Sequence, residues 1–396
     1  MTRNNAMVQI LIIDDDPITQ LLIRRALEKQ GYQVAVAANG QDGLARAKQT
    51  QPALVICDWM MPVLDGIEVC QHLKSTPYLS ATFFILLTSR SDLEDRIAGL
   101  NAGADEFLTK PIDMSELQAR VRAGLRIYHL HQDLQTQKQK LETALAEAAQ
   151  YVHSILPAPL ESPIQITSRF IPSQQLGGDC FDYYWLTPET LVVYLLDVSG
   201  HGLGAALPSV SILNMLRSQA FPGINYEHPH EVLHALNLQF AMSQENPKYL
   251  TIWYGVYHHL RRELVYASAG HPPALLVSNS QTLDIQPLKT PGLPLGMFTE
   301  SQYVSHRCHI APEQILYIFS DGIYEIHQPN DAMLGLEGFS TILKQLHQQG
   351  TPSIEQLLAQ IQQRCNSPGF TDDLALMQVS FCEDASSVPY NPVPRH

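Results

Sequence analysis

The chain has 396 residues, of which 45% are hydrophobic and 16% charged, and this balance is typical of a globular protein with two or more domains. Its 25 lysines and arginines against 39 aspartates and glutamates give a formal net charge of -14, which argues against nonspecific nucleic-acid binding because that binding neutralises phosphates with basic side chains. The six cysteines form no C-x-x-C pair, and neither a signal peptide nor a run of about 18 apolar residues is present, so we expect a soluble, cytoplasmic protein.

Residues 7–126 alternate short apolar runs with amphipathic stretches. The apolar runs are VQILII, YQVAVA, ALVIC, TFFILLTS and DEFLTK. Five strands that alternate with five helices predict a doubly wound, flavodoxin-like α/β domain with a five-stranded parallel sheet. Ligands of such sheets bind beyond the carboxyl ends of the strands.

Residues 127–158 contain no glycine, and no proline before Pro157, which predicts a helical linker. A near-heptad seam, interrupted at Gln137, is formed by Leu130, Leu134, Leu141, Ala144, Ala148, Tyr151 and Ile155. Two interpretations remain open: a coiled coil that forms a homodimer, or a single amphipathic helix that lies on a neighbouring domain.

Residues 159–383 change to strand-like runs joined by proline and glycine turns, among them TLVVYLLDV, LTIWYGVYH, ILYIFSDG and LALMQVSF. Four further segments, near 203–220, 230–242, 337–349 and 353–364, have helical patterns. Together they predict an α+β domain, a β-sandwich flanked by helices. The Pro-rich tail at 384–396 is expected to be disordered.

Acidic, hydroxyl and amine side chains stand where the predicted parallel strands end. Asp14 and Asp15 follow the first strand, and Asp58 follows the third. Thr88 and Lys110 end the fourth and fifth. This set fits phosphoryl transfer to a carboxylate, in which paired acids hold Mg²⁺, Asp58 attacks phosphorus, and Lys110 and Thr88 contact the phosphoryl oxygens.

In these residues and their spacing the segment resembles the receiver domain of two-component response regulators. The resemblance implies that Asp58 accepts phosphate from the phosphohistidine of a histidine kinase. The implied Mg²⁺ site is made by the carboxylates of Asp14, Asp15 and Asp58 with the carbonyl of Met60. Thr88 and Phe107 are implied to reorient on phosphorylation, although a fixed core position is the alternative for Phe107.

Aspartates recur beside glycines or turns in the C-terminal half, in LGGDCFDYY, LLDVSGHGLGAAL, IFSDGIYE and FTDDLALM. So many carboxylates in one place would repel one another unless cations neutralised them. Hard oxygen donors without a His/Cys cluster favour Mg²⁺ or Mn²⁺. Two such ions about 3.5–4 Å apart would hold a hydroxide in line with a phosphate ester, so the pattern predicts a phosphatase.

With SAGHPPALL and TPGLPLGM, these motifs are similar to the SpoIIE-type branch of the metal-dependent serine/threonine protein phosphatases, which have the type 2C fold. The resemblance implies that Asp197 bridges both ions and that Val198 contributes its carbonyl. Asp179 would complete one metal shell, and Asp321 and Asp372 the other. The candidates for a supporting or purely structural role are Asp182, Asp373 and His201.

We therefore expect a response regulator in which phosphorylation at Asp58 controls a phosphatase, with activation as the expected sign. By resemblance, the substrate is a phosphoserine or phosphothreonine protein, plausibly an anti-sigma-factor antagonist of the STAS type. One alternative is a non-enzymatic docking protein with a degenerate phosphatase fold. The other is a receiver-linked nucleotide cyclase, because LGGDCF resembles the GGDEF signature without its glutamate.

Overall fold

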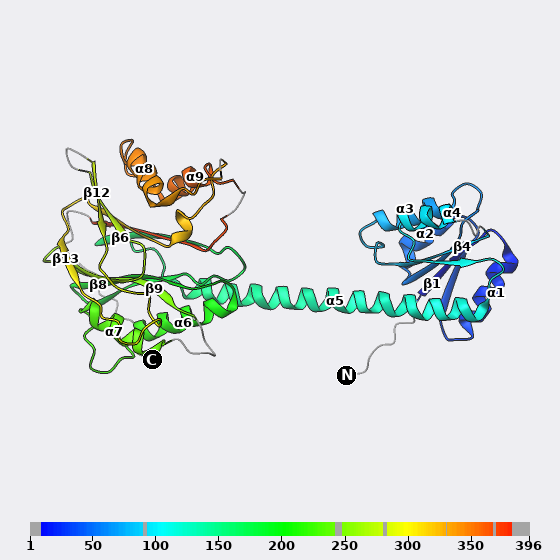
Figure 1. Cartoon of the computed structure of the whole chain (residues 1–396), viewed down its shortest axis with the longest axis horizontal. Coiled ribbons are helices and arrows are strands. Elements are labelled where there is room, and N and C mark those ends of the chain that lie inside the picture. Colours follow the sequence, from blue (N-terminus) through cyan, green and yellow to red (C-terminus); the bar gives the residue numbers. More distant parts are fainter. Residues whose placement is uncertain are drawn as a thin grey trace. The chain divides into compact units, whose positions relative to one another are not determined.

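The protein is described from a computed structural model, in which residues 9–89, 93–241, 248–279, 283–329, 331–366 and 370–381 are described. The chain divides into two compact units, Met1–Glu142 and Thr143–His396, which are considered separately below (Figure 1). The tail expected to be disordered, 384–396, lies outside the described residues. Within those residues, no helix combines the length and the apolar character that a membrane crossing requires.

The N-terminal unit confirms the predicted doubly wound sheet, with five parallel strands in the order β2-β1-β3-β4-β5. The strands are β1 (Gln9–Ile13), β2 (Gln33–Ala37), β3 (Leu54–Asp58), β4 (Phe83–Thr88) and β5 (Glu106–Thr109). The helices that connect them are α1 (Pro17–Glu28), α2 (Gly40–Thr50), α3 (Gly66–Ser75) and α4 (Leu93–Asn101). Apolar clusters pack on both faces of the sheet, which explains the uninterrupted apolar runs of β3 and β4.

The next helix, α5 (Met114–Ile155), is continuous and has no break at the predicted boundary between residues 126 and 127. Its first turns pack on the sheet through Leu117 and Val121. A Cβ atom at Gly124 would lie 2.3 Å from the Phe83 ring, so this glycine lets the helix lie close to the sheet. Beyond this point the sequence consists mainly of good helix formers, and the helix therefore continues into the predicted linker.

The C-terminal unit contains two antiparallel sheets of five strands each, with the orders β13-β10-β9-β8-β7 and β12-β11-β14-β15-β6. The first sheet consists of β7 (Cys180–Thr187), β8 (Thr190–Val198), β9 (Leu250–His258), β10 (Glu263–Ala269) and β13 (His306–His309). The second consists of β6 (Ile164–Ile171), β11 (Ala274–Asn279), β12 (Leu283–Leu288), β14 (Ile315–Phe319) and β15 (Leu374–Phe381). The predicted β-sandwich is confirmed, and Trp253 and Met377 are part of the apolar core between the sheets.

Helices cover both outer faces of the sandwich (Figure 1). They are α6 (Leu203–Arg217) and α7 (Pro229–Gln239) on one face, and α8 (Gly335–His347) and α9 (Ile354–Gln362) on the other. The sequence pattern did not single out β7, β12 or β13. β7 carries a buried aspartate in an aromatic run, and β13 has only four residues. β12 alternates apolar and polar residues over its first four positions but then contains a proline, which weakens the strand pattern.

Candidate functional sites

The receiver acids converge at the carboxyl ends of β1 and β3. Asp14, Asp15 and Asp58 each offer a carboxylate oxygen, and these oxygens lie within 4.8 Å of one another. Asp14 and Asp58 are buried, whereas Asp15 is exposed. The Asp14 side chain accepts a hydrogen bond from the Asp16 backbone N–H at 2.8 Å, and Asp16 itself caps α1. Three converging hard oxygen donors suit a divalent cation such as Mg²⁺.

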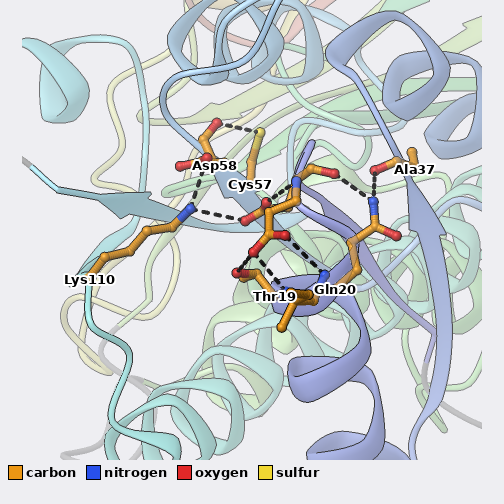
Figure 2. Close-up of polar contacts among 9 residues, drawn as sticks. Thr19, Gln20, Ala37, Cys57, Asp58 and Lys110 are labelled. Carbon is orange, nitrogen blue, oxygen red and sulfur yellow. Dashed lines mark hydrogen bonds and ion pairs between the residues drawn. The ribbon is translucent and has the colours of Figure 1, made fainter.

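Lys110 closes the other side of this cluster, one residue after β5. Its Nζ lies 2.9 Å from Asp58 Oδ2 and 3.2 Å from Asp14 Oδ2 (Figure 2). Burial lowers the pKa of Lys110, but the hydrogen bond to Asp58 and the charge of Asp14 outweigh it and leave the pKa raised. Burial is also the main reason why the pKa of Asp14 is raised. The amine therefore stays charged beside the carboxylate that is the predicted phosphoacceptor.

The remaining receiver positions lie around this edge of the sheet. Thr88 is buried at the end of β4. Phe107 is also buried and belongs to an apolar cluster, and a Cβ atom at Gly99 would lie 2.6 Å from its ring. The Met60 side chain is 57% exposed in the loop after β3. Phe107 is therefore packed inward. This position agrees with a fixed core residue, and it also agrees with one of the two orientations of a residue that moves on phosphorylation.

In the C-terminal unit the predicted metal-binding aspartates stand at ends of both sheets. Asp179 directly precedes β7, and Asp197 is the penultimate residue of the neighbouring β8. Asp321 begins the short 3-10 turn η1 (Asp321–Ile323) after β14, and Asp372 shortly precedes β15. Asp179 is buried, Asp197 and Asp321 are half-buried, and Asp372 is exposed. The sandwich therefore gathers residues separated by almost 200 positions in the sequence.

Electrostatics show that these carboxylates interact. Burial, followed by the charges of Asp321, Asp372 and Asp373, raises the pKa of Asp197 to about 7. Burial and the charge of Asp197 raise the pKa of Asp179 well above its usual range. For Asp321, burial and the charges of Glu325 and Asp372 raise the pKa to about 6. At mildly acidic pH, metal-free protein therefore holds protons where it would otherwise hold repelling charges.

The donor set fits divalent cations. Asp179 Oδ2 is a buried oxygen without a hydrogen-bond partner in the described part of the chain, and a buried unpaired carboxylate oxygen is costly unless a cation binds it. The ligands offered are all oxygens, which Mg²⁺ and Mn²⁺ prefer. Unlike the receiver acids, these aspartates do not bring three donor oxygens within 4.8 Å of one another, as far as the described side chains go.

Two candidate supporting acids have different roles. Asp373 accepts hydrogen bonds from Ser173 N at 2.8 Å and Gly178 N at 2.7 Å, so it fixes the loop that leads to Asp179. Asp182 is buried and forms an ion pair with the half-buried Arg217 at the end of α6, with Arg217 Nε 2.5 Å from Asp182 Oδ2. This contact, between β7 and α6, is what the structural alternative for Asp182 requires.

The GGD and DVSGHG motifs do not by themselves reveal which groups contact them in the folded chain. A Cβ atom at Gly177 would lie 2.6 Å from the Asp373 carboxylate, and one at Gly178 only 2.4 Å from the Val198 carbonyl oxygen. The Ser209 hydroxyl donates to the Gly178 carbonyl. His201 is exposed, and no described hydrogen bond connects it to the acids. The paired glycines were the available signal, since they mark a close backbone approach.

Metal-free protein should lose stability as the pH rises. The pKa values of Asp197 and Asp321 in the folded state, about 7 and about 6, exceed the ordinary 3.8, so the stabilising protons are lost between about pH 4 and 7. After EDTA treatment, we expect calorimetry of the full chain to show a melting temperature on the order of 5 °C lower at pH 7.5 than at pH 5. Saturating Mn²⁺ should raise the melting temperature more at pH 7.5 than at pH 5. In the Asp197→Asn variant, the melting temperature of metal-free protein should depend less on pH. A metal-free melting temperature that rises over this interval contradicts the assignment.

Comparisons with known proteins agree with both halves of the structure. The sequence model of the response regulator receiver domain matches residues 10–122, and that of Stage II sporulation protein E (SpoIIE) matches residues 187–381. The SiaA-PP2C domain of Pseudomonas aeruginosa is similar in fold, with a TM-score of 0.53 and 20% identity over 62% of this chain and 98% of that domain.

Among curated proteins, the DNA-binding dual master transcriptional regulator RpaA of Synechocystis sp. is 45% identical over 120 residues, which is 30% of this chain and 50% of RpaA. The transcriptional regulatory protein AfsQ1 of Streptomyces coelicolor is 41% identical over 120 residues, which is 30% of this chain and 52% of AfsQ1. The chain thus spans about half the length of the curated relatives it matches. The chain therefore contains a response regulator receiver domain and a SpoIIE domain, and its C-terminal unit shares the fold of the SiaA-PP2C domain.

Proposed function

We propose that this response regulator is a metal-dependent protein phosphatase, controlled through Asp58, that removes phosphate from phosphoserine or phosphothreonine on a partner protein. The observation that carries the proposal is the electrostatic contact among Asp179, Asp197, Asp321 and Asp372, the last three of which lie within the residues that the SpoIIE model matches. The buried Asp179 oxygen without a partner supports a cation there, because a degenerate site has no need for such a group.

The proposed roles follow from the positions of the side chains. Asp197, central to these interactions, would hold both cations with the carbonyl of Val198. Asp179 would complete one shell, and Asp321 and Asp372 the other. When bound, a pair of Mg²⁺ or Mn²⁺ ions supplies Lewis-acid stabilisation of the phosphate ester and lowers the pKa of water. The carboxylates supply the negative charge that the two cations require, so both partners are neutralised.

In the receiver, Asp58 would accept the phosphoryl group from a histidine kinase, with Mg²⁺ held by Asp14, Asp15, Asp58 and the carbonyl of Met60. The Lys110 amine, 2.9 Å from Asp58, would transfer its ion pair to the new phosphoryl oxygens. Thr88 and Phe107 would then reorient and shift the population of receiver conformations. The α5 helix would carry this shift to the phosphatase, whose activation is the expected result.

The test compares hydrolysis of p-nitrophenyl phosphate and of phosphoproteins from the source cell with and without beryllofluoride, which mimics the phosphoryl group on Asp58. We expect Mn²⁺-dependent hydrolysis and a faster rate with beryllofluoride. Equal rates on both substrates would remove the control by the receiver. A docking protein without activity would show partner binding but no hydrolysis, and a cyclase would produce a cyclic dinucleotide from GTP.

The substrate class follows from the same proposal. A SpoIIE-type domain would act on a phosphorylated STAS-type anti-sigma-factor antagonist, which presents a phosphoserine or phosphothreonine on a folded surface. Purified phosphorylated antagonist, added in the same assay, should release phosphate in proportion to enzyme. If only other phosphoproteins are hydrolysed, this choice of partner is wrong while the phosphatase proposal stands.

The predicted homodimer rests on the seam of α5. Leu130, Leu134 and Leu141 are 62%, 68% and 62% exposed, so they are available to a second copy. A Leu134→Glu change would remove one buried apolar side chain from each helix of a dimer. Each loss would weaken the free energy of dimerisation by about 1.5–3 kcal/mol. Light scattering should therefore show a dimer for the unchanged protein and a monomer for this variant at micromolar concentration. Gln150→Glu on the same helix is the control, and a monomeric unchanged protein contradicts the prediction.

A further inference from the structure

The glycines after Asp197 leave room for a lysine side chain. A Cβ atom at Gly200 would lie 3.2 Å from Lys248 Nζ, and one at Gly204 would lie 3.5 Å from Lys248 Cε. Gly200 also has a φ of +89°, which disfavours other residues. The half-buried Lys248 therefore crosses the loop between β8 and α6, the loop that follows the central aspartate of the proposed metal site.

A group of three hydrogen bonds, called the latch below, connects Ser199 to Lys248 and Tyr249. Lys248 Nζ donates to the Ser199 carbonyl at 2.9 Å. The Ser199 N–H donates to the Tyr249 carbonyl at 2.9 Å, and the Tyr249 N–H donates to Ser199 Oγ at 3.2 Å. All three polar groups of Ser199 are thus bound by two consecutive residues. The latch extends the pairing of β8 with β9, whose last partners are Val198 and Leu250.

The other side of the same backbone faces the loop that carries Asp179. The Val198 N–H donates to the Gly178 carbonyl at 3.4 Å, and a Cβ atom at Gly178 would lie 2.4 Å from the Val198 carbonyl oxygen. Residues 197–199 are therefore held between Gly178 and the Lys248–Tyr249 pair. If the latch on Ser199 opens, the peptide that carries the Val198 carbonyl loses its support on the Ser199 side, while the pairing of Asp197 and Val198 with β9 remains.

We propose that Lys248 is a positioning residue, which fixes the Asp197–Ser199 segment for binding of divalent cations. This inference rests on the proposed phosphatase function. The ammonium group suits the role because it donates a charge-assisted hydrogen bond to the Ser199 carbonyl. Groups that orient metal ligands typically change metal affinity by about 10–100-fold when they are removed. Lys248 should therefore affect affinity for the metal more than the rate at saturating metal.

The experiment uses the full chain with Asp14→Asn in every protein, so that the receiver acids do not contribute to the binding signal. Mn²⁺ binding is measured directly by electron paramagnetic resonance, and the Mn²⁺ dependence of p-nitrophenyl phosphate hydrolysis is measured in parallel. For Lys248→Met we expect Mn²⁺ affinity roughly 10-fold lower, a maximal rate within about threefold of the parent, and an unchanged metal-free melting temperature. Lys248→Arg, which keeps a donor, should recover most of the affinity.

Matched variants separate the outcomes. Lys344→Met, on the exposed face of α8, should leave Mn²⁺ affinity unchanged. Ser199→Ala removes one acceptor of the latch and should weaken Mn²⁺ binding in the same direction but less, which keeps a test available if Lys248→Met does not fold. If Lys248→Met binds Mn²⁺ with an affinity within twofold of the parent, the inference about Lys248 is overturned. If the parent still hydrolyses the ester in that case, the proposed phosphatase function stands. A parent that neither binds Mn²⁺ nor hydrolyses the ester overturns both.

Discussion

Asp197→Ala is expected to lower Mn²⁺-dependent phosphatase activity by more than about 100-fold. Loss of a residue that only hydrogen-bonds to a metal ligand typically lowers activity by about 10–100-fold. The reason for the larger effect is the position of Asp197 at the centre of the acidic group, where Asp321, Asp372 and Asp373 all raise its pKa. Loss of a ligand shared by two cations would affect both metal shells at once. The measurement is the initial rate of phosphate release at several Mn²⁺ concentrations.

The control for this variant is Asp284→Ala, which removes an exposed aspartate from β12 and should leave the rate unchanged. Calorimetry of Asp197→Ala without metal is the second control. Because the removed carboxylate is repelled by its neighbours in metal-free protein, this variant should melt no lower than the parent at pH 7.5. Undiminished hydrolysis by a folded Asp197→Ala protein would show that the metal site lies elsewhere.

Asp58→Asn is expected to abolish labelling of the protein by radioactive acetyl phosphate or by a phosphorylated histidine kinase. The amide keeps the shape of the side chain but lacks the negative charge that makes the carboxylate a nucleophile and that pairs with Lys110 Nζ at 2.9 Å. The same variant should make phosphatase activity independent of beryllofluoride. In the unchanged protein we expect a change of roughly tenfold, within the usual range of coupling between two sites.

Asp133→Asn, an exposed position on α5, is the matched control and should be labelled like the unchanged protein. Mapping of labelled peptides would locate the label in the unchanged protein and in each variant. Label that persists at another residue of Asp58→Asn overturns the choice of phosphoacceptor. If Asp58→Asn is not labelled but its phosphatase activity still responds to beryllofluoride, the regulation does not act through the receiver acids.

The strand-end acids of the receiver could be found from the sequence because their spacing is set locally. Asp14, Asp58 and Lys110 follow short apolar runs, and the parallel arrangement brings such ends to one edge of the sheet. The same logic found Asp197 and Asp321, which also end apolar strands. It did not mark the end of the receiver helix, because Gly124 did not interrupt α5 once the helix was packed on Phe83.

The sequence by itself thus determined the order of the domains and the two-sheet architecture, and it supplied the acids proposed for both sites, since periodicity and strand ends are properties of neighbouring residues. Only the tertiary structure decided which side chains support those sites. Asp373 accepts a hydrogen bond from the Gly178 N–H, 195 residues away, and Lys248 binds a carbonyl 49 residues away. Such pairs are chosen by the packing of helices on sheets, for which a single sequence carries no local pattern.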